Sequence, residues 1–557
     1  MRILRLVGAS HVEVGGKLRR HRSSMTRPIF ALSALALALI FGQPARLSAQ
    51  EEKESKPSEA KSAEAKSAEA KPTEGKEPAP KEESSVTEHT IRLGGQTIPY
   101  KATASTTLLK NDKGDPAALL FSIAYTRSDV KDASTRPLAF IYNGGPGSSS
   151  VWLHMGAFGP RRIVTANAPQ ATPPSPYKVV DNTDCLLDKT DMVFIDPVGT
   201  GYSHAVGKAQ GKDFWGVDED VKSLAQFILT YVSRNNRWNS PKFLIGESYG
   251  TFRSAALSHY LQSTNHMDFN GIVLVSSVLD VGTLSFKIGN EMPYVFYVPS
   301  YAAAAWINKM LKDRPDDLEA FLGEARQFAS TEYLAALMKG SKLADAEKAG
   351  IAKKLSRFTG LSEDYLVKAN LRVSLPQFNA ELERSKGLTT GRYDARFTGP
   401  TYDLLTEQAE YDPSYTAVAG AFTAAINSYL REDLKFMSDR TYEILSFEPG
   451  RNWNWKHTVP GGGGGSFFPG SPNVEDDLIA AMLFNTHLQV QVENGYFDMA
   501  TPFFATEWTM DHLLLPASLR SNIHLDHYTA GHMMYLNDAD HDKLAANVRA
   551  FIGSASR

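Results

Sequence analysis

A serine stands between two glycines in the segment 246–250, which reads Gly-Glu-Ser-Tyr-Gly. The segment follows the apolar run 243–245 and precedes the small-residue stretch 254–257, so the pattern indicates a turn from a strand into a helix. Such a turn strains its central residue and has room only for glycine-sized residues two positions before and after it. Ser248 is therefore the candidate nucleophile, and a chance match in a chain with 41 glycines is the alternative.

A serine nucleophile needs a base, because its hydroxyl is a poor nucleophile at neutral pH, and the base needs an orienting carboxylate. Around such a turn the partners follow in the order Ser, Asp, His, at the ends of late strands. Asp498 follows the apolar run 488–492, and His532 follows the run 523–525. We expect these two to complete the triad, against the alternative that each only satisfies a loop hydrogen bond. The nearby competitors are Glu493, His524, Asp526, His527 and Asp538.

Short apolar runs typical of buried strands recur along the chain. A hairpin is expected around residues 89–100 and a further strand at 118–125, and the other runs lie at 138–142, 192–195, 243–245, 272–275, 488–492 and 523–525. Helical patterns separate several runs, the clearest at 217–232. The sequence therefore predicts an α/β-hydrolase fold, with a mostly parallel central sheet and helices on both faces.

A long connection interrupts the predicted sheet. Roughly 200 residues separate the runs 272–275 and 488–492, and helical patterns recur in them, as at 317–328 and 344–357. We expect the first part of the hydrolase core at 87–284 and its second part at 481–557. Between them, residues 285–480 are expected to form a mainly helical insertion over the active site.

The first 49 residues resemble an export signal. The apolar run 29–42 is short of the roughly 20 residues that a membrane-spanning helix needs, and small residues near Ala49 offer a cleavage site. Met25 is an alternative start, and an uncleaved anchor helix is the alternative reading. Cys185 is the single cysteine, so no intrachain disulfide can form. We expect an exported protein without a stable membrane anchor, periplasmic or secreted by a bacterium.

The composition of the chain indicates which kinds of binding partner are improbable. Residues 50–86 cycle through Glu, Lys, Ala, Ser and Pro and are expected to form a disordered tether, and glycines 461–465 a flexible loop. A net charge of −3 over 557 residues, without a basic stripe, argues against nucleic acid. His524 and His527 lack the i, i+4 spacing of helical metal ligands, so neither a metal site nor a cofactor is expected.

Several segments together resemble the signature blocks of the serine carboxypeptidases. The blocks are residues 143–150 (Asn-Gly-Gly-Pro-Gly-Ser-Ser-Ser), 196–203 (Asp-Pro-Val-Gly-Thr-Gly-Tyr-Ser), 247–249, 494–498 and 530–533 (Ala-Gly-His-Met). The resemblance implies hydrolysis of the peptide bond next to a free C-terminal carboxylate, through an acyl-enzyme on Ser248. Peptide or protein C-termini would then be the substrates.

The resemblance also implies roles for the first block and for the residues flanking Ser248. The backbone N–H groups of Gly145 and Tyr249 would form the oxyanion hole. Asn143, Gly144 and Glu247 would bind the substrate carboxylate. Because two bare carboxylates repel each other, Glu247 would have to share a proton with the substrate, which favours acidic pH.

The chain departs from the family pattern in the carboxylate-binding region. Ala157 stands where the family usually has a second glutamate, and Arg161 and Arg162 are candidates to compensate, with solvated surface arginines as the alternative. This departure leaves an esterase or acyltransferase on the same machinery as the second hypothesis. A catalytically silent binding protein is the third.

Overall fold

The computed structural model describes residues 80–461 and 471–556. The predicted leader, most of the predicted tether and glycines 462–465 lie outside these residues. Strand β1 (Ser84–Leu93) begins inside the stretch that we expected to be a tether. Its first residues pair with β2, Ser84 opposite Ser105, so backbone pairing with a long neighbouring strand extends the order beyond what composition indicates.

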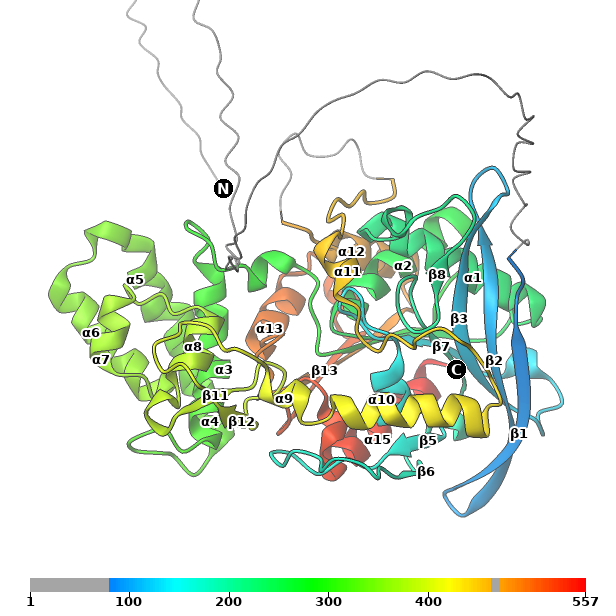
Figure 1. Cartoon of the computed structure of the whole chain (residues 1–557). Helices are drawn as coiled ribbons and strands as arrows, with labels where there is room; N and C mark the ends of the chain where they lie inside the picture. Colours follow the sequence, from blue (N-terminus) through cyan, green and yellow to red (C-terminus); the bar gives the residue numbers. More distant parts are fainter. Residues whose placement is uncertain (1–79, 462–470, 557) are drawn as a thin grey trace, which may run out of the picture. The chain divides into compact units, whose positions relative to one another are not determined.

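The central sheet has ten strands in the order β1-β2-β3-β7-β4-β9-β10-β13-β14, with β8 paired to β3. Neighbours from β1 to β7 are antiparallel, and every pair from β7 to β14 is parallel. Figure 1 shows the antiparallel strands in blue at one edge. The remaining bounds are β2 (Gln96–Lys110), β3 (Pro116–Arg127), β4 (Leu138–Tyr142), β7 (Asp191–Ile195), β8 (His204–Ala205), β9 (Lys242–Glu247), β10 (Gly271–Val275), β13 (Gln489–Gly495) and β14 (Ile523–Tyr528).

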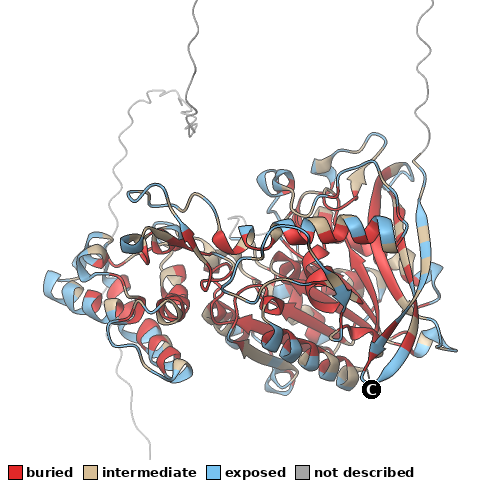
Figure 2. Ribbon diagram, turned by 60° about the horizontal axis from the view of Figure 1, so that its bottom comes forward, coloured by how far each residue is buried: buried red, intermediate tan, exposed pale blue. Residues whose placement is uncertain are grey.

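The central strands β4, β7, β9 and β10 are buried on both faces (Figure 2). Helices α1 (Val217–Arg234), α2 (Tyr249–Asn265) and α12 (Glu475–Phe484) cover one face, where Phe140 and Leu244 join their core. Successive strand residues point to opposite faces, so Ile141 and Ile245 pack into the second core, with α10 (Ala419–Ser428) and α15 (Asp538–Ala555). Strands that are buried on both faces need apolar residues at successive positions, which explains the continuous apolar runs in the sequence.

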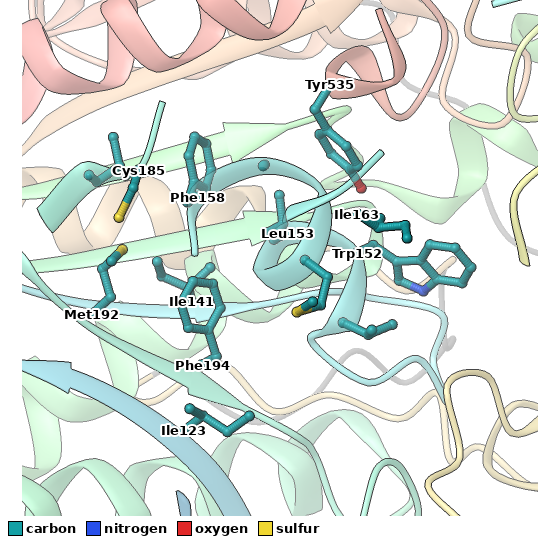
Figure 3. Packing of buried hydrophobic residues seen from close by; sticks show 14 of the residues in the cluster. Ile123, Ile141, Trp152, Leu153, Phe158, Ile163, Cys185, Met192, Phe194 and Tyr535 are labelled. Carbon is teal, nitrogen blue, oxygen red and sulfur yellow. The ribbon is translucent and has the colours of Figure 1, made fainter. Parts of the chain in front are cut away.

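The second core also contains the π-helical turn Leu153–Phe158 and Cys185 (Figure 3). Phe158, Met192 and Phe194 belong to the same cluster as the cysteine. Burial raises the pKa of the Cys185 thiol to about 12, so the side chain packs as a small apolar group.

The segment between β10 and β13 divides into two groups of helices. Helices α3 to α8 form a core of their own, in which the rings of Tyr301 and Phe378 stack with centroids 3.9 Å apart. Helices α10 and α12, from the same segment, pack instead on the two faces of the central sheet. The bounds are α3 (Met292–Ile307), α4 (Leu318–Phe328), α5 (Leu334–Lys339), α6 (Asp345–Thr359), α7 (Glu363–Lys368), α8 (Leu375–Glu381), β11 (Leu388–Thr390), β12 (Thr398–Pro400), α9 (Pro413–Thr416) and α11 (Phe447–Arg451).

The small remaining elements complete the described chain. They are β5 (Arg161–Ile163), β6 (Val179–Asp181), α13 (Phe503–His512) and α14 (Ala517–Arg520). No helix within residues 80–461 and 471–556 is long and apolar enough to cross a membrane.

Candidate active site

Ser248 is the single residue between strand β9 and helix α2. Its backbone angles are φ 61° and ψ −130°, a strained conformation of the kind that gathers at functional sites. Gly246 and Gly250 make the turn tight, since a Cβ at Gly246 would lie 2.2 Å from the carbonyl oxygen of Gly250. The two glycines therefore allow the close backbone contact that lifts Ser248 out of the turn.

His532 and Asp498 form a hydrogen-bonded pair at the carboxyl ends of β14 and β13. The His532 Nδ1 atom lies 2.8 Å from Asp498 Oδ2, and both side chains are buried. Asp498 also accepts hydrogen bonds from the amides of Ala500 and Thr501 and from the Thr501 hydroxyl. A carboxylate only accepts hydrogen bonds, so His532 Nδ1 carries the proton and Nε2 keeps a free lone pair.

The charge of His532 depends on opposing effects. Burial lowers the pKa of the imidazole, while the Asp498 carboxylate and, less strongly, Glu247 raise it, and the net shift is upward. The backbone is held as well, because His532 N–H donates to the Tyr393 carbonyl at 2.6 Å and the Ser276 hydroxyl donates to the His532 carbonyl at 2.8 Å. The ring is thus fixed from both the sheet and the inserted segment.

Ser248 and His532 line the same cavity, of about 80 Å³. Asp498 does not line it and instead accepts the hydrogen bond from the Nδ1 side of the imidazole. The structure thus places Ser248 and His532 at one cavity, with Asp498 bonded to the imidazole behind it. The other lining residues are Asn143, Gly144, Gly145, Ser148, Trp152, Glu247, Arg392, Tyr393, Tyr415, Leu445 and Met533.

Two backbone amides at this place are without a protein acceptor. Tyr249 N–H is the first amide of α2, and Gly145 N–H lies in the loop after β4; neither donates to an acceptor among the described residues. The loop lies against the turn at Gly144, because a Cβ at this position would be 2.4 Å from Tyr249 N. The loop and the start of the helix are therefore in close backbone contact, and each has an N–H group without a protein acceptor.

Glu247 is held by two donors. Asn143 Nδ2 donates to its Oε1 and the Tyr535 hydroxyl to its Oε2, both at 2.8 Å. Burial dominates over these hydrogen bonds and raises the pKa of Glu247 to about 7. Asn143, Gly144 and Glu247 all border the cavity beside Ser248.

The competitors for the triad lie away from the cavity, and most of them have other partners. His527 pairs with Glu507 at 2.8 Å, and Asp526 accepts from Gln491 at 3.0 Å. Glu493 accepts from Tyr528 at 2.7 Å. His524 makes no side-chain hydrogen bond within the described part of the chain, and none of the competitors borders the cavity.

The substitution at position 157 is not compensated by the neighbouring arginines. Ala157 is buried in the π-helical turn and does not line the cavity. Arg161 pairs with Asp181 at 2.6 Å and Arg162 with Asp538 at 2.7 Å, both away from the cavity. The cation that does border the cavity is Arg392.

Sequence reasoning missed Thr501, Tyr535, Arg392 and Tyr393. Thr501 and Tyr535 lie three residues after Asp498 and His532, a spacing that places them at the same loops but carries no chemical signal of its own. Arg392 and Tyr393 come from the loop between β11 and β12, about 140 residues before His532, and only the fold brings them to the site.

Within the described ranges, no three His, Cys, Asp or Glu side chains are grouped so that they could hold a metal ion.

The sheet topology and the strand–Ser–helix turn define the class of the protein, an α/β-hydrolase fold. Residues 99–315 match the family model of the serine carboxypeptidases. Relatives in two yeasts match part of the chain as well. The pheromone-processing carboxypeptidase KEX1 of Saccharomyces cerevisiae is 30% identical over 147 residues, which cover 24% of this chain and 19% of the relative.

KEX1 of Yarrowia lipolytica is 25% identical over 181 residues, 32% of this chain and 26% of the relative. The matches thus span less than a third of these curated relatives. The crystal structure of KEX1ΔP, a prohormone-processing carboxypeptidase from Saccharomyces cerevisiae, superimposes with a TM-score of 0.52 at 16% identity, covering 82% of this chain and 91% of that one. At this identity the likeness concerns the fold.

Proposed function

We propose that this protein is a serine carboxypeptidase that hydrolyses C-terminal peptide bonds through an acyl-enzyme on Ser248. The observation that carries the proposal is the 2.8 Å contact of His532 Nδ1 with Asp498, on a histidine that shares its cavity with a strained Ser248. The match of residues 99–315 to the serine carboxypeptidase model makes peptides the first substrates to test.

The chemistry follows from the positions of the polar groups. His532 Nε2 takes the proton of the Ser248 hydroxyl as the oxygen attacks the scissile carbonyl carbon. The resulting oxyanion accepts hydrogen bonds from the Gly145 and Tyr249 amides, and Asp498 stabilises the imidazolium. His532 then protonates the leaving amine, and a water molecule hydrolyses the acyl-enzyme by the same steps.

Recognition of the chain end would fall to Asn143, Gly144 and Glu247. Below a pH of about 7 Glu247 is neutral, so it has a proton to share with a substrate carboxylate. Above that pH it is ionised and repels the substrate. The proposal therefore includes a preference for acidic conditions when the substrate is a peptide.

An esterase or acyltransferase is the second candidate, and Ala157 is the observation that favours it. A second acid is missing from the expected carboxylate-binding set, and Arg161 and Arg162 are already paired. The triad and the two amides would act on an ester as readily as on a peptide.

The deciding experiment digests peptides with the purified protein and follows the masses of the products. A ladder that loses residues from the C-terminus, and that is blocked by C-terminal amidation, is expected. Turnover of simple esters together with inert peptides would favour the second candidate.

Ser248→Ala should lower the rate by about 10⁴ to 10⁶-fold, as in other enzymes of this type. Ser263→Ala is the matched control, because that hydroxyl lies farther along α2 and bonds only within the helix. A Ser248→Ala rate within tenfold of the parent, with folding unchanged, would contradict the proposal.

Export is part of the proposal on sequence grounds alone, from the apolar run 29–42 and the small residues near Ala49. Mass analysis of the N-terminus of the protein recovered from the periplasm or medium tests it, and recovery only of an unprocessed cytoplasmic chain would contradict it.

A further inference from the structure

Arg392 is carried into the site by a loop that is fixed to the triad. Its amide donates to Asp412 Oδ1 at 3.1 Å, and its carbonyl accepts from Met499 N–H at 3.1 Å, one residue after Asp498. The next residue, Tyr393, accepts the His532 amide and lies with its ring centroid 5.3 Å from that of the imidazole. The position of this arginine is thus coupled to that of the base.

The guanidinium of Arg392 lacks a carboxylate partner. It lies 5.0 Å from the centre of the Tyr393 ring and, alone among the cavity-lining residues, carries a permanent positive charge. It forms no salt bridge within the described residues, whereas Arg396 in the same loop is paired with Asp394 at 2.6 Å. The side chain of Arg392 remains exposed, so its donors are open to a ligand that enters the cavity.

The acids nearest the cavity are already committed to other partners. Asp498 accepts from His532 and Thr501, and Glu247 accepts from Asn143 and Tyr535. The protein thus provides donors around Glu247 and, beside Tyr393 and His532, a cation that Asp412 attracts from a distance without forming an ion pair. An anionic group on the substrate could therefore pair with Arg392 in this cavity.

We propose that Arg392 binds a carboxylate of the substrate and thereby determines which peptides are cleaved. A planar guanidinium offers two parallel N–H groups to a carboxylate, a stronger and more directional contact than a single neutral hydrogen bond. The carboxylate has two sources: the C-terminal carboxylate itself or an acidic side chain next to the scissile bond. The inference rests on the proposed function and adds a residue that the family resemblance did not supply.

Under this inference, Arg392 would take over the carboxylate-binding role of the glutamate that is absent at position 157. A second glutamate binds a carboxylate only by sharing a proton, whereas an arginine attracts it at every pH at which peptides are stable. With Arg392 in place, binding would persist after Glu247 loses its proton, although more weakly.

The test compares Arg392→Gln and Arg392→Lys on three substrates, of which the neutral peptide and the ester share one acyl group. The first is a blocked dipeptide with neutral side chains and a free carboxylate, the second has glutamate before the scissile bond, and the third is an uncharged ester. Arg92→Gln is the matched control, since Arg92 is an exposed residue of β1 that forms no ion pair within the described chain.

We expect Arg392→Gln to reduce the ratio of peptide to ester kcat/KM by about 10- to 100-fold, mainly through KM, as for loss of a charged hydrogen-bonding group. Arg392→Lys should lose less, and Arg92→Gln should leave the ratio unchanged. A loss shared by both peptides identifies the C-terminal carboxylate, and a loss confined to the glutamate peptide identifies the side chain.

Equal losses for ester and peptides, or no loss for any substrate, would overturn the inference. Thermal unfolding of each variant separates a folding defect from a binding defect. A parent protein that cleaves no peptide with a free C-terminus contradicts the proposed function itself, before any variant is compared.

Discussion

Glu247 is the residue whose protonation state, in the proposed function, governs binding of a substrate carboxylate. Its oxygens accept from Asn143 and Tyr535, and burial raises its pKa to about 7, so it changes charge within the physiological range. It also contributes to the raised pKa of His532. In the proposed function, one side chain would thus affect both substrate binding and the fraction of His532 that is neutral.

Glu247→Gln should separate these two effects. For a peptide, parent kcat/KM should fall as the pH rises through about 7, because the ionised glutamate repels the substrate; the neutral glutamine should extend activity to higher pH. For an uncharged ester, activity rises as His532 loses its proton. This rise should move to lower pH in the variant, because the negative charge that helped hold the proton is gone.

Glu493→Gln is the control for that pH series. Burial raises the pKa of Glu493 to about 8, yet its side chain accepts from Tyr528 and does not border the cavity. Its profiles should follow those of the parent. Peptide and ester profiles that stay parallel in the parent, and unchanged in Glu247→Gln, would contradict the carboxylate-binding role.

At this scale the sequence predicts residues that belong to local motifs. Ser248 is predicted from its glycines, and Asp498 and His532 from chain order, because each stands at the end of a strand that its own neighbours reveal. Arg392 and Tyr535 were missed, because their relation to the site depends on contacts between segments that are distant in sequence. The guess of Arg161 and Arg162 fails because both have acidic partners nearby in space.

The loop after β4 and the turn after β9 form one structural element in the site. Gly144 lies so close to the turn that a Cβ would be 2.4 Å from Tyr249 N and 2.8 Å from the Glu247 carbonyl oxygen. Real Cβ atoms essentially never approach backbone atoms so closely. The loop can therefore lie against the turn only if residue 144 is a glycine. This contact sets the distance between the two free amides.

Gly144→Ala should displace the loop and lower kcat/KM by about 100-fold, the scale expected for a misplacement of about 1 Å. We expect it to destabilise the fold by about 1–3 kcal/mol as well, by overpacking. Steady-state kinetics and urea unfolding measure the two effects.

Gly323→Ala is the comparison, since nothing lies within 4 Å of its Cβ position in α4. It should stabilise the protein by about 0.5–1 kcal/mol, through helix propensity, and leave kinetics unchanged. Full activity in Gly144→Ala would show that the loop does not set the amide positions.

Elements with a strong period or a long apolar run were predictable from the sequence. The patterns at 317–328 and 344–357 correspond to α4 and α6, and the run 138–142 is β4. The two-stranded pair β11–β12 was not expected, because three-residue strands depend on each other rather than on their own composition. The division of the helices between two cores follows from tertiary packing, which periodicity does not encode.

At the scale of the whole molecule, the inserted segment packs against the loops that carry Asp498 and His532 and forms hydrogen bonds with them. The core of α3 to α8 includes Tyr496, Phe497 and Phe503, which flank Asp498. Arg396 donates to the Thr529 carbonyl beside the His532 loop, and Asp394 compensates its buried charge. The insertion therefore contributes to the position of the base and of the acid.

Asp394→Ala should destabilise the protein by about 3–5 kcal/mol, because it leaves Arg396 buried without a counter-ion. Chemical unfolding monitored by intrinsic fluorescence measures the loss, and activity should fall in parallel at temperatures below the transition. The control is Asp364→Ala, which breaks the exposed pair with Lys368 and should cost less than about 1 kcal/mol. Equal effects of the two changes would contradict the structural role of the Asp394–Arg396 pair.

The Tyr393 carbonyl that holds the His532 amide has a consequence for the order in which the protein matures on the ribosome. The serine is translated before the inserted helices, and the histidine, whose backbone needs one of their carbonyls, is translated after them. At about 5–20 residues per second, the intervening stretch, on the order of 280 residues, takes tens of seconds to emerge. During that interval the nascent chain would carry the proposed nucleophile without its proposed base, so under the proposed function hydrolysis would begin only after β14 has joined the sheet.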